Sequence, residues 1–110
     1  MIDKDKVLIA LTTCPSQESA QAIAKTLVNE RLAACVNQVA GVQSTYRWND
    51  EVLTESEVLL VIKTTEEQFP ALKARLGEIH PYELPELMGI PVCAGAEKYL
   101  AWVVDTVKSS

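Results

Sequence analysis

The chain has 110 residues, and its 10 lysines and arginines against 15 aspartates and glutamates give a formal net charge of −5. This length fits one domain, and we take residues 1–110 as a single folding unit. The acidic balance excludes nucleic acid as a partner, because a phosphate-backbone binder needs a basic face. No apolar run approaches the ~20 residues that cross a bilayer, and the first residues do not form a signal peptide. We therefore expect no membrane association and a cytoplasmic location.

The first predicted elements are a strand and an amphipathic helix. The short apolar run 7–11 is rich in β-branched residues, which predicts a buried strand. Ser16 is expected to cap the helix that follows. The apolar residues of this helix recur at i, i+3, i+4, i+7 and i+8, which predicts one buried face: Ala20, Ile23, Ala24, Leu27 and Val28.

Two alternating runs joined by Asn49-Asp50 predict one long β-hairpin, with a bulge at Gly41. Each arm runs to roughly 12–14 residues, on the order of 40 Å, so the hairpin must extend beyond a domain of this size. Its outer half carries apolar side chains that nothing in the same chain covers. An uncovered apolar ribbon favours pairing with another subunit, so we expect an oligomer.

The second half of the chain predicts a helix, a short strand and a last helix. Thr65–Gln68 matches a capping box ahead of an apolar stripe at Phe69, Leu72, Leu76 and Ile79. A proline-rich connector leads to a strand over 87–92, which Pro91 places at a sheet edge or ends. The last helix starts at about Glu97.

This order predicts an α+β fold of the ferredoxin-like, split βαβ type. Both main helices are expected on one face of a four-stranded antiparallel sheet. The other face is left open in a monomer, which gives a second reason to expect self-association.

Five blocks of sequence resemble the CutA divalent-cation-tolerance family, in the order and spacing of that family over almost the whole chain. They are Arg31–Asn37, Tyr46–Trp48, Leu60–Thr65, His80–Glu86 and Tyr99–Trp102. The resemblance implies a homotrimer with an architecture similar to that of PII-type signal-transduction proteins. It also implies that the hairpins wrap neighbouring subunits, that clefts form between subunits, and that the protein is linked to copper and other divalent cations.

Three residues are candidate metal ligands under this resemblance: His80, Glu86 and Cys35. Copper(I) favours thiolate and imidazole ligands, and copper(II) favours nitrogen and oxygen donors, so these residue types are permissible. Thr12 stands where family ligand proposals place a cysteine, and Cys14 follows two residues later. No cofactor is required; copper or another divalent cation is the candidate ligand.

Other residues are assigned to a ligand cleft and to the trimer interface. The predicted cleft residues are Lys63, Tyr82, Glu83 and Trp102. The predicted interface residues are Tyr46, Trp48 and Tyr99, because tyrosine and tryptophan are enriched where subunits meet. Two alternatives without a ligand-binding role stay open. His80 can serve only as a hydrogen-bonding residue, and Glu83 and Glu86 can serve as ion-pair partners of Lys63 or Arg47.

Three functions from different classes follow. The leading one is a non-enzymatic homotrimer that binds metal or a small ligand in its intersubunit clefts. The second is a structural trimer that docks an unidentified protein partner and has no ligand of its own. The third is an enzyme that uses Cys35 and His80 as a nucleophile and its base, although no third orienting group is identifiable.

Overall fold

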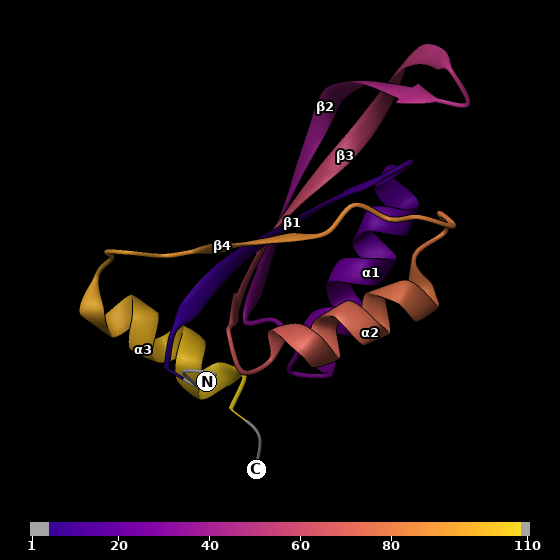
Figure 1. Ribbon diagram of the computed structural model, residues 1–110. Coiled ribbons are helices and arrows are strands. Elements are labelled where there is room, and N and C mark those ends of the chain that lie inside the picture. The colour runs from indigo at the N-terminus through magenta and orange to yellow at the C-terminus, as the bar shows by residue number, and fades with distance from the viewer. Residues whose placement is uncertain (1–4, 109–110) are drawn as a thin grey trace.

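The computed structural model describes residues 5–108, which form four strands and three helices (Figure 1). In chain order these are β1 (Val7–Cys14), α1 (Gln17–Asn29), β2 (Cys35–Trp48), β3 (Glu51–Thr65), α2 (Phe69–Ile79), β4 (Met88–Pro91) and α3 (Glu97–Thr106). The strands form one sheet in the order β2-β3-β1-β4, and all neighbours are antiparallel. The predicted α+β, ferredoxin-like fold is confirmed. Within the described residues, no helix is both long and apolar enough to span a membrane.

The main core lies between one face of the sheet and the helices α1 and α2 (Figure 1). Alternate residues of β1 and β3 face the helices, because side chains alternate across a strand. Ser16 caps α1 as predicted and forms a reciprocal capping box with Ser19. Val28 was predicted on the buried stripe, but it lies at the edge of that stripe and is 40% exposed.

The predicted capping box at Thr65–Gln68 forms only in part. Thr65 still belongs to β3, and its Oγ1 accepts a hydrogen bond from the Gln68 N–H at 3.3 Å. The side chain of Gln68 donates instead to the carbonyls of Val107, at 2.6 Å, and Arg31, at 3.3 Å. Residues 66–68 therefore form a turn that fastens the end of α3, and α2 begins at Phe69.

The long hairpin is confirmed and extends away from the body of the sheet (Figure 1). Asn49 and Asp50 have φ values of 51° and 64°, the left-handed pair that a two-residue hairpin turn requires. Gly41 has φ 79° at a register shift between Val39 and Val42, which is the predicted bulge. The molecule is consequently elongated, at 43 × 27 × 25 Å.

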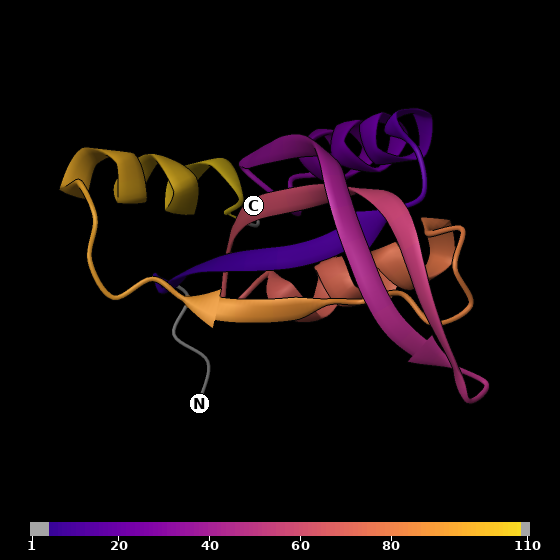
Figure 2. The same ribbon diagram turned by 90° about the horizontal axis from the view of Figure 1, so that it is seen from above.

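The opposite face of the sheet is largely apolar, with Lys63 and Asn37 as its polar residues in the rows that follow, and it is covered by neither α1 nor α2. The register aligns side chains on this face in rows across all four strands: Ile90, Ile9, Lys63 and Cys35, then Met88, Leu11, Val61 and Asn37. Helix α3 lies at the end of the sheet away from the hairpin turn (Figure 2). It packs there on a second, smaller core of Val7, Ala34, Val103 and Val107.

Candidate functional site

The connector between α2 and β4 is fastened to the sheet at several points. Helix α2 ends where predicted: His80 is extended, with φ −76° and ψ 137°, as a residue before proline should be. Further along, the Thr12 hydroxyl donates to the Glu86 carbonyl at 2.5 Å. The connector is therefore held against β1 at both of its ends, by Thr12 near Glu86 and by Thr13 at His80.

Both ring nitrogens of His80 have partners within the chain. The ring is buried, with Nε2 2.8 Å from the Thr13 carbonyl, and Nδ1 accepts from the Tyr82 N–H at 3.0 Å. These partners assign the neutral tautomer in which Nε2 carries the proton, because a carbonyl can only accept and an N–H can only donate. A metal ion could reach a ring nitrogen only by displacing one of these bonds.

Tyr82 links the connector to the base of the hairpin. Its hydroxyl donates to Oε2 of Glu57 at 2.6 Å, and its ring lies 4.9 Å from the His80 ring. Burial raises the pKa of Tyr82 well above its usual range, and the hydrogen bond and charge of Glu57 add to this shift. Tyr82 is therefore a neutral donor at physiological pH. Glu57 itself is only 8% exposed and was not among the predicted site residues.

Cys14 lies beside this network on β1. Burial raises the pKa of the Cys14 thiol to about 11, and the charge of Glu57 is the second cause. Because the thiolate is the form that attacks electrophiles and binds metals, Cys14 is an inert thiol at neutral pH. This side chain acts as a small hydrophobe of the core.

Cys35 lies elsewhere, at the start of β2 and directly across from Lys63 of β3. The Lys63 ammonium donates to Cys35 Sγ at 3.8 Å and to the side-chain carbonyl of Asn37. Both Cys35 and Lys63 are half-buried on the open face of the sheet. The nearest polar partner of the Cys35 thiol is thus a lysine, not a histidine.

The three candidate metal ligands are not gathered within one chain. Lys63, opposite Cys35, pairs with Ile9, whereas His80 bonds to Thr13, four residues further along β1. At ~3.3 Å per residue, these four residues separate Cys35 from His80 by about 13 Å along the strand direction. The predicted alternative of a Cys35–His80 nucleophile and base therefore has no geometric basis inside the chain. Across residues 5–108, no three His, Cys, Asp or Glu side chains are grouped so as to hold a metal ion.

The four predicted cleft residues are also spread over the molecule. Lys63 is on the open face, Tyr82 is in the network with Glu57, and Glu83 is exposed on the connector. Trp102 lies on α3 and stacks on Tyr99 at 5.6 Å, with both rings nearly half exposed. The two interface candidates of the hairpin, Tyr46 and Trp48, are exposed near its turn, and the Tyr46 hydroxyl donates to Glu55.

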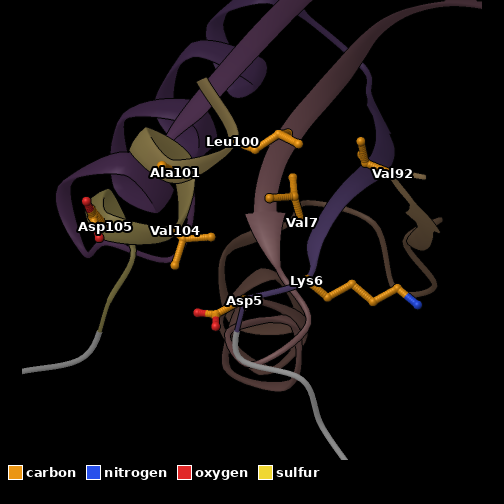
Figure 3. Close-up of a pocket in the computed structure, with 8 residues that line it drawn as sticks. All are labelled: Asp5, Lys6, Val7, Val92, Leu100, Ala101, Val104 and Asp105. Atoms are coloured by element: carbon orange, nitrogen blue, oxygen red, sulfur yellow. The ribbon is translucent and has the colours of Figure 1, made fainter. Parts of the chain in front are cut away.

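A groove of about 630 Å³ lies beside α3, and no sequence pattern predicted it (Figure 3). Its walls are partly apolar and partly polar, and its polar lining residues come from the segment just before β1 and from the end of α3. The lining comprises Val7, Val92, Leu100, Ala101 and Val104, with Asp5, Lys6 and Asp105. Only tertiary packing of α3 against β1 creates this groove, so no local pattern could have revealed it.

Comparison with known proteins gives close relatives. The chain is 50% identical over 95 residues to the divalent-cation tolerance protein CutA of Thermus thermophilus, covering 86% of this chain and 92% of that one. It is 35% identical over 102 residues to the chloroplastic protein CutA of Arabidopsis thaliana, covering 93% of this chain but only 56% of that protein. The solved structure of the T. thermophilus Cut A1 protein superposes with a TM-score of 0.89 at 48% identity, covering 91% and 97% of the two chains.

The strand order and the two crossover helices on one sheet face define an α+β protein of the ferredoxin-like class. The family model described as CutA1 divalent ion tolerance protein matches residues 8–106. The chain belongs to this family.

Proposed function

We propose that the chain acts as a homotrimer in divalent-cation tolerance. In this proposal it binds copper, another divalent cation or a small ligand in clefts between its subunits, in the cytoplasm and without catalysing a reaction. The observation that carries the proposal is the apolar sheet face left open by α1 and α2, together with a hairpin that extends beyond its own body. That the oligomer has three subunits is implied by the resemblance to the family.

Self-assembly also accounts for the scatter of the candidate residues. Cys35, Glu86 and Trp102 lie on different parts of one chain, but a closed ring brings different surfaces of neighbouring copies together. Residues that are separate in the monomer can then line one cleft. Because both nitrogens of His80 are occupied, we assign His80 to supporting the connector, and we assign cation binding to Glu86 and Cys35.

The test begins with native mass spectrometry of untagged protein, where we expect a species of three times 12.1 kDa. Calorimetric titration with Cu²⁺ should then give saturable binding that a Cys35→Ser, Glu86→Gln variant reduces. Cys93→Ser is the matched control, because Cys93 is an exposed thiol outside the proposed site. A 12.1 kDa species at micromolar concentration would contradict the trimer. Equal Cu²⁺ binding by the variant and the control would contradict the ligand assignment.

A second candidate function is a trimer that docks a protein partner and binds no ligand. The exposed Tyr99–Trp102 pair on α3 favours it, because aromatic residues are enriched at the centres of protein interfaces. This candidate expects a specific protein to be captured from a lysate and lost with Trp102→Ala, together with no heat on Cu²⁺ titration. Saturable Cu²⁺ binding, with no Trp102-dependent capture, would rule in favour of the first function.

A further inference from the structure

Cys35 and Lys63 form a cysteine–lysine pair whose reactive atoms lie next to each other. The two residues are direct partners in the register of β2 and β3, and the Lys63 ammonium donates to Cys35 Sγ at 3.8 Å. Its other acceptor is the neutral side-chain carbonyl of Asn37. Across residues 5–108, no ion pair includes Lys63. The amine nitrogen is therefore held beside a sulfur atom instead of a carboxylate.

The other two cysteines are too far from Cys35 to form a disulfide with it inside one chain. A disulfide needs Cα atoms within about 7 Å of each other. Cys14 lies five residues along β1 from Ile9, which shares the row of Cys35, so about 16 Å separates the two cysteines along the strand direction. Cys93 lies three residues past Ile90, and Ile90 is three strand spacings from Cys35, or about 14 Å. The amine across the strand pair is thus the group placed to react with this sulfur.

The exposure of the pair favours a small oxidant. Cys35 and Lys63 are both half-buried, whereas Cys14 is fully buried and Cys93 is exposed. Oxidation of a cysteine depends on access to its sulfur. A half-buried sulfur can be reached by a molecule as small as hydrogen peroxide, while the surrounding strands limit the approach of larger thiols. A cysteine sulfenic acid formed here would meet the lysine before it met a second thiol.

We propose that Cys35 and Lys63 are a site of reversible oxidation by peroxides, in which a sulfur–nitrogen bond joins the two side chains. Hydrogen peroxide first oxidises the sulfur: Sγ attacks one peroxide oxygen, the O–O bond breaks, and the leaving hydroxide takes the thiol proton and becomes water. Cys35 is then a sulfenic acid. Lys63 Nζ gives up one proton to solvent and attacks Sγ. The S–O bond breaks, and the leaving hydroxide takes a second proton from the nitrogen and becomes water.

The product is a sulfenamide that links β2 to β3 on the open face of the sheet. A thiol reverses the reaction: it attacks Sγ, the Lys63 amine leaves, and a second thiol releases Cys35 from the mixed disulfide. This inference goes beyond the proposed function and does not depend on it, because neither a cation nor a second subunit takes part. Where both hold, the linked form has no free Cys35 thiol for a cation, so a peroxide would suppress binding at that ligand.

The test uses the full-length chain with Cys93→Ser, which removes an exposed thiol that would add its own oxidation products. After treatment with hydrogen peroxide, we expect the intact mass to fall by the mass of two hydrogen atoms, and dithiothreitol to restore it. Trypsin cleaves after free lysines, so it should not cleave after the linked Lys63. Mass spectrometry of the digest should find segment 32–47, which contains Cys35, joined to segment 48–73.

Two further variants in the same Cys93→Ser chain test the role of the amine. Lys63→Arg keeps the positive charge and the hydrogen-bond donors, but a guanidinium stays protonated and does not attack sulfur. We expect this variant to lose the link completely and to gain oxygen on Cys35 instead. Lys73→Arg is the matched control, because it makes the same change at an exposed lysine of α2 and should leave the link intact. The linked segments of the Cys93→Ser chain locate the bond directly, whether or not Lys63→Arg folds.

Four results would overturn the inference. They are an unchanged mass after peroxide, oxygen gained on Cys35 without linked segments, disulfide-linked chains on a non-reducing gel, and a link that survives Lys63→Arg or disappears in Lys73→Arg. Each of these leaves the proposed function standing, because Cu²⁺ titration and native mass spectrometry measure different properties. Conversely, a chain that binds no Cu²⁺ but forms the link would overturn the cation-binding function and support this inference.

Discussion

At the scale of single residues, His80 is a structural support whose two hydrogen bonds both serve main-chain groups. We expect His80→Ala to lower the free energy of unfolding by about 2–4 kcal/mol, because it leaves two main-chain groups at a buried site unpaired at ~1–2 kcal/mol each. Equilibrium unfolding in guanidinium chloride measures the change. Glu83→Ala, an exposed change on the same connector, should stay within about 0.5 kcal/mol. Equal effects of the two variants would show that the His80 bonds contribute nothing.

Cys14 makes stability depend on pH in the alkaline range. Its pKa is raised from 9.0 to about 11 in the folded state, so the unfolded chain loses this proton first as the pH rises. The contribution of Cys14 is fully present below pH 9 and is lost progressively as the pH rises through about 11. The Tyr82 hydroxyl, whose pKa is also raised, adds to the same decline above its ordinary range.

The measurement is the unfolding midpoint of wild type and Cys14→Ala from pH 7 to 10.5. We expect the wild type to lose more stability over this range than the variant, which keeps only the Tyr82 part. Cys93→Ser, at an exposed thiol, should follow the wild-type curve. Parallel curves for wild type and Cys14→Ala would contradict the assignment.

At the scale of elements, two glycines with equally open surroundings should respond in opposite ways to alanine. A Cβ at Gly41 or Gly77 would meet nothing within 4 Å, so only the backbone distinguishes them. Gly41 has φ 79° in the bulge, where alanine should be destabilising by about 1–2 kcal/mol. Gly77 lies inside α2, where alanine should be stabilising by about 0.5–1 kcal/mol. Thermal unfolding of both variants tests the pair, and a change of the same sign in both would refute the role of the bulge.

Local signals predicted most of the elements, because periodicity and turn chemistry act within a few residues. The Ser16 cap, the Gly41 bulge and the Asn49-Asp50 turn were all identifiable in this way and are confirmed. The Thr65 capping box failed in part because Gln68 is recruited by a carbonyl 39 positions away. A tertiary contact of this kind leaves no local trace in the sequence.

The candidate site could be predicted only as a set of residues, not as an arrangement. The proline connector was predicted as the segment between the second helix and the fourth strand, but the pairing of His80 with Thr13 depends on how α2 packs against the sheet. Glu57 was missed because strand alternation places it on the sheet face opposite to the inward-facing Val58, where a charged residue is expected to be exposed. Its hydrogen bond to Tyr82 is a long-range contact that strand alternation does not reveal. Residue types therefore indicated the chemistry, and long-range packing decided which groups meet.

At the scale of the whole molecule, the open sheet face should decide whether the protein assembles. Ile90 of β4 is 47% exposed on that face, so Ile90→Lys would place one positive charge from every subunit in the proposed interface. Burying unpaired charges is strongly unfavourable, and we expect this variant to sediment as a 12.1 kDa species at micromolar concentration. Val28→Lys is the matched control, because Val28 is 40% exposed on the helical side, and it should leave the oligomer intact. An intact oligomer in Ile90→Lys, or dissociation in Val28→Lys, would mean that the subunits associate through a different surface.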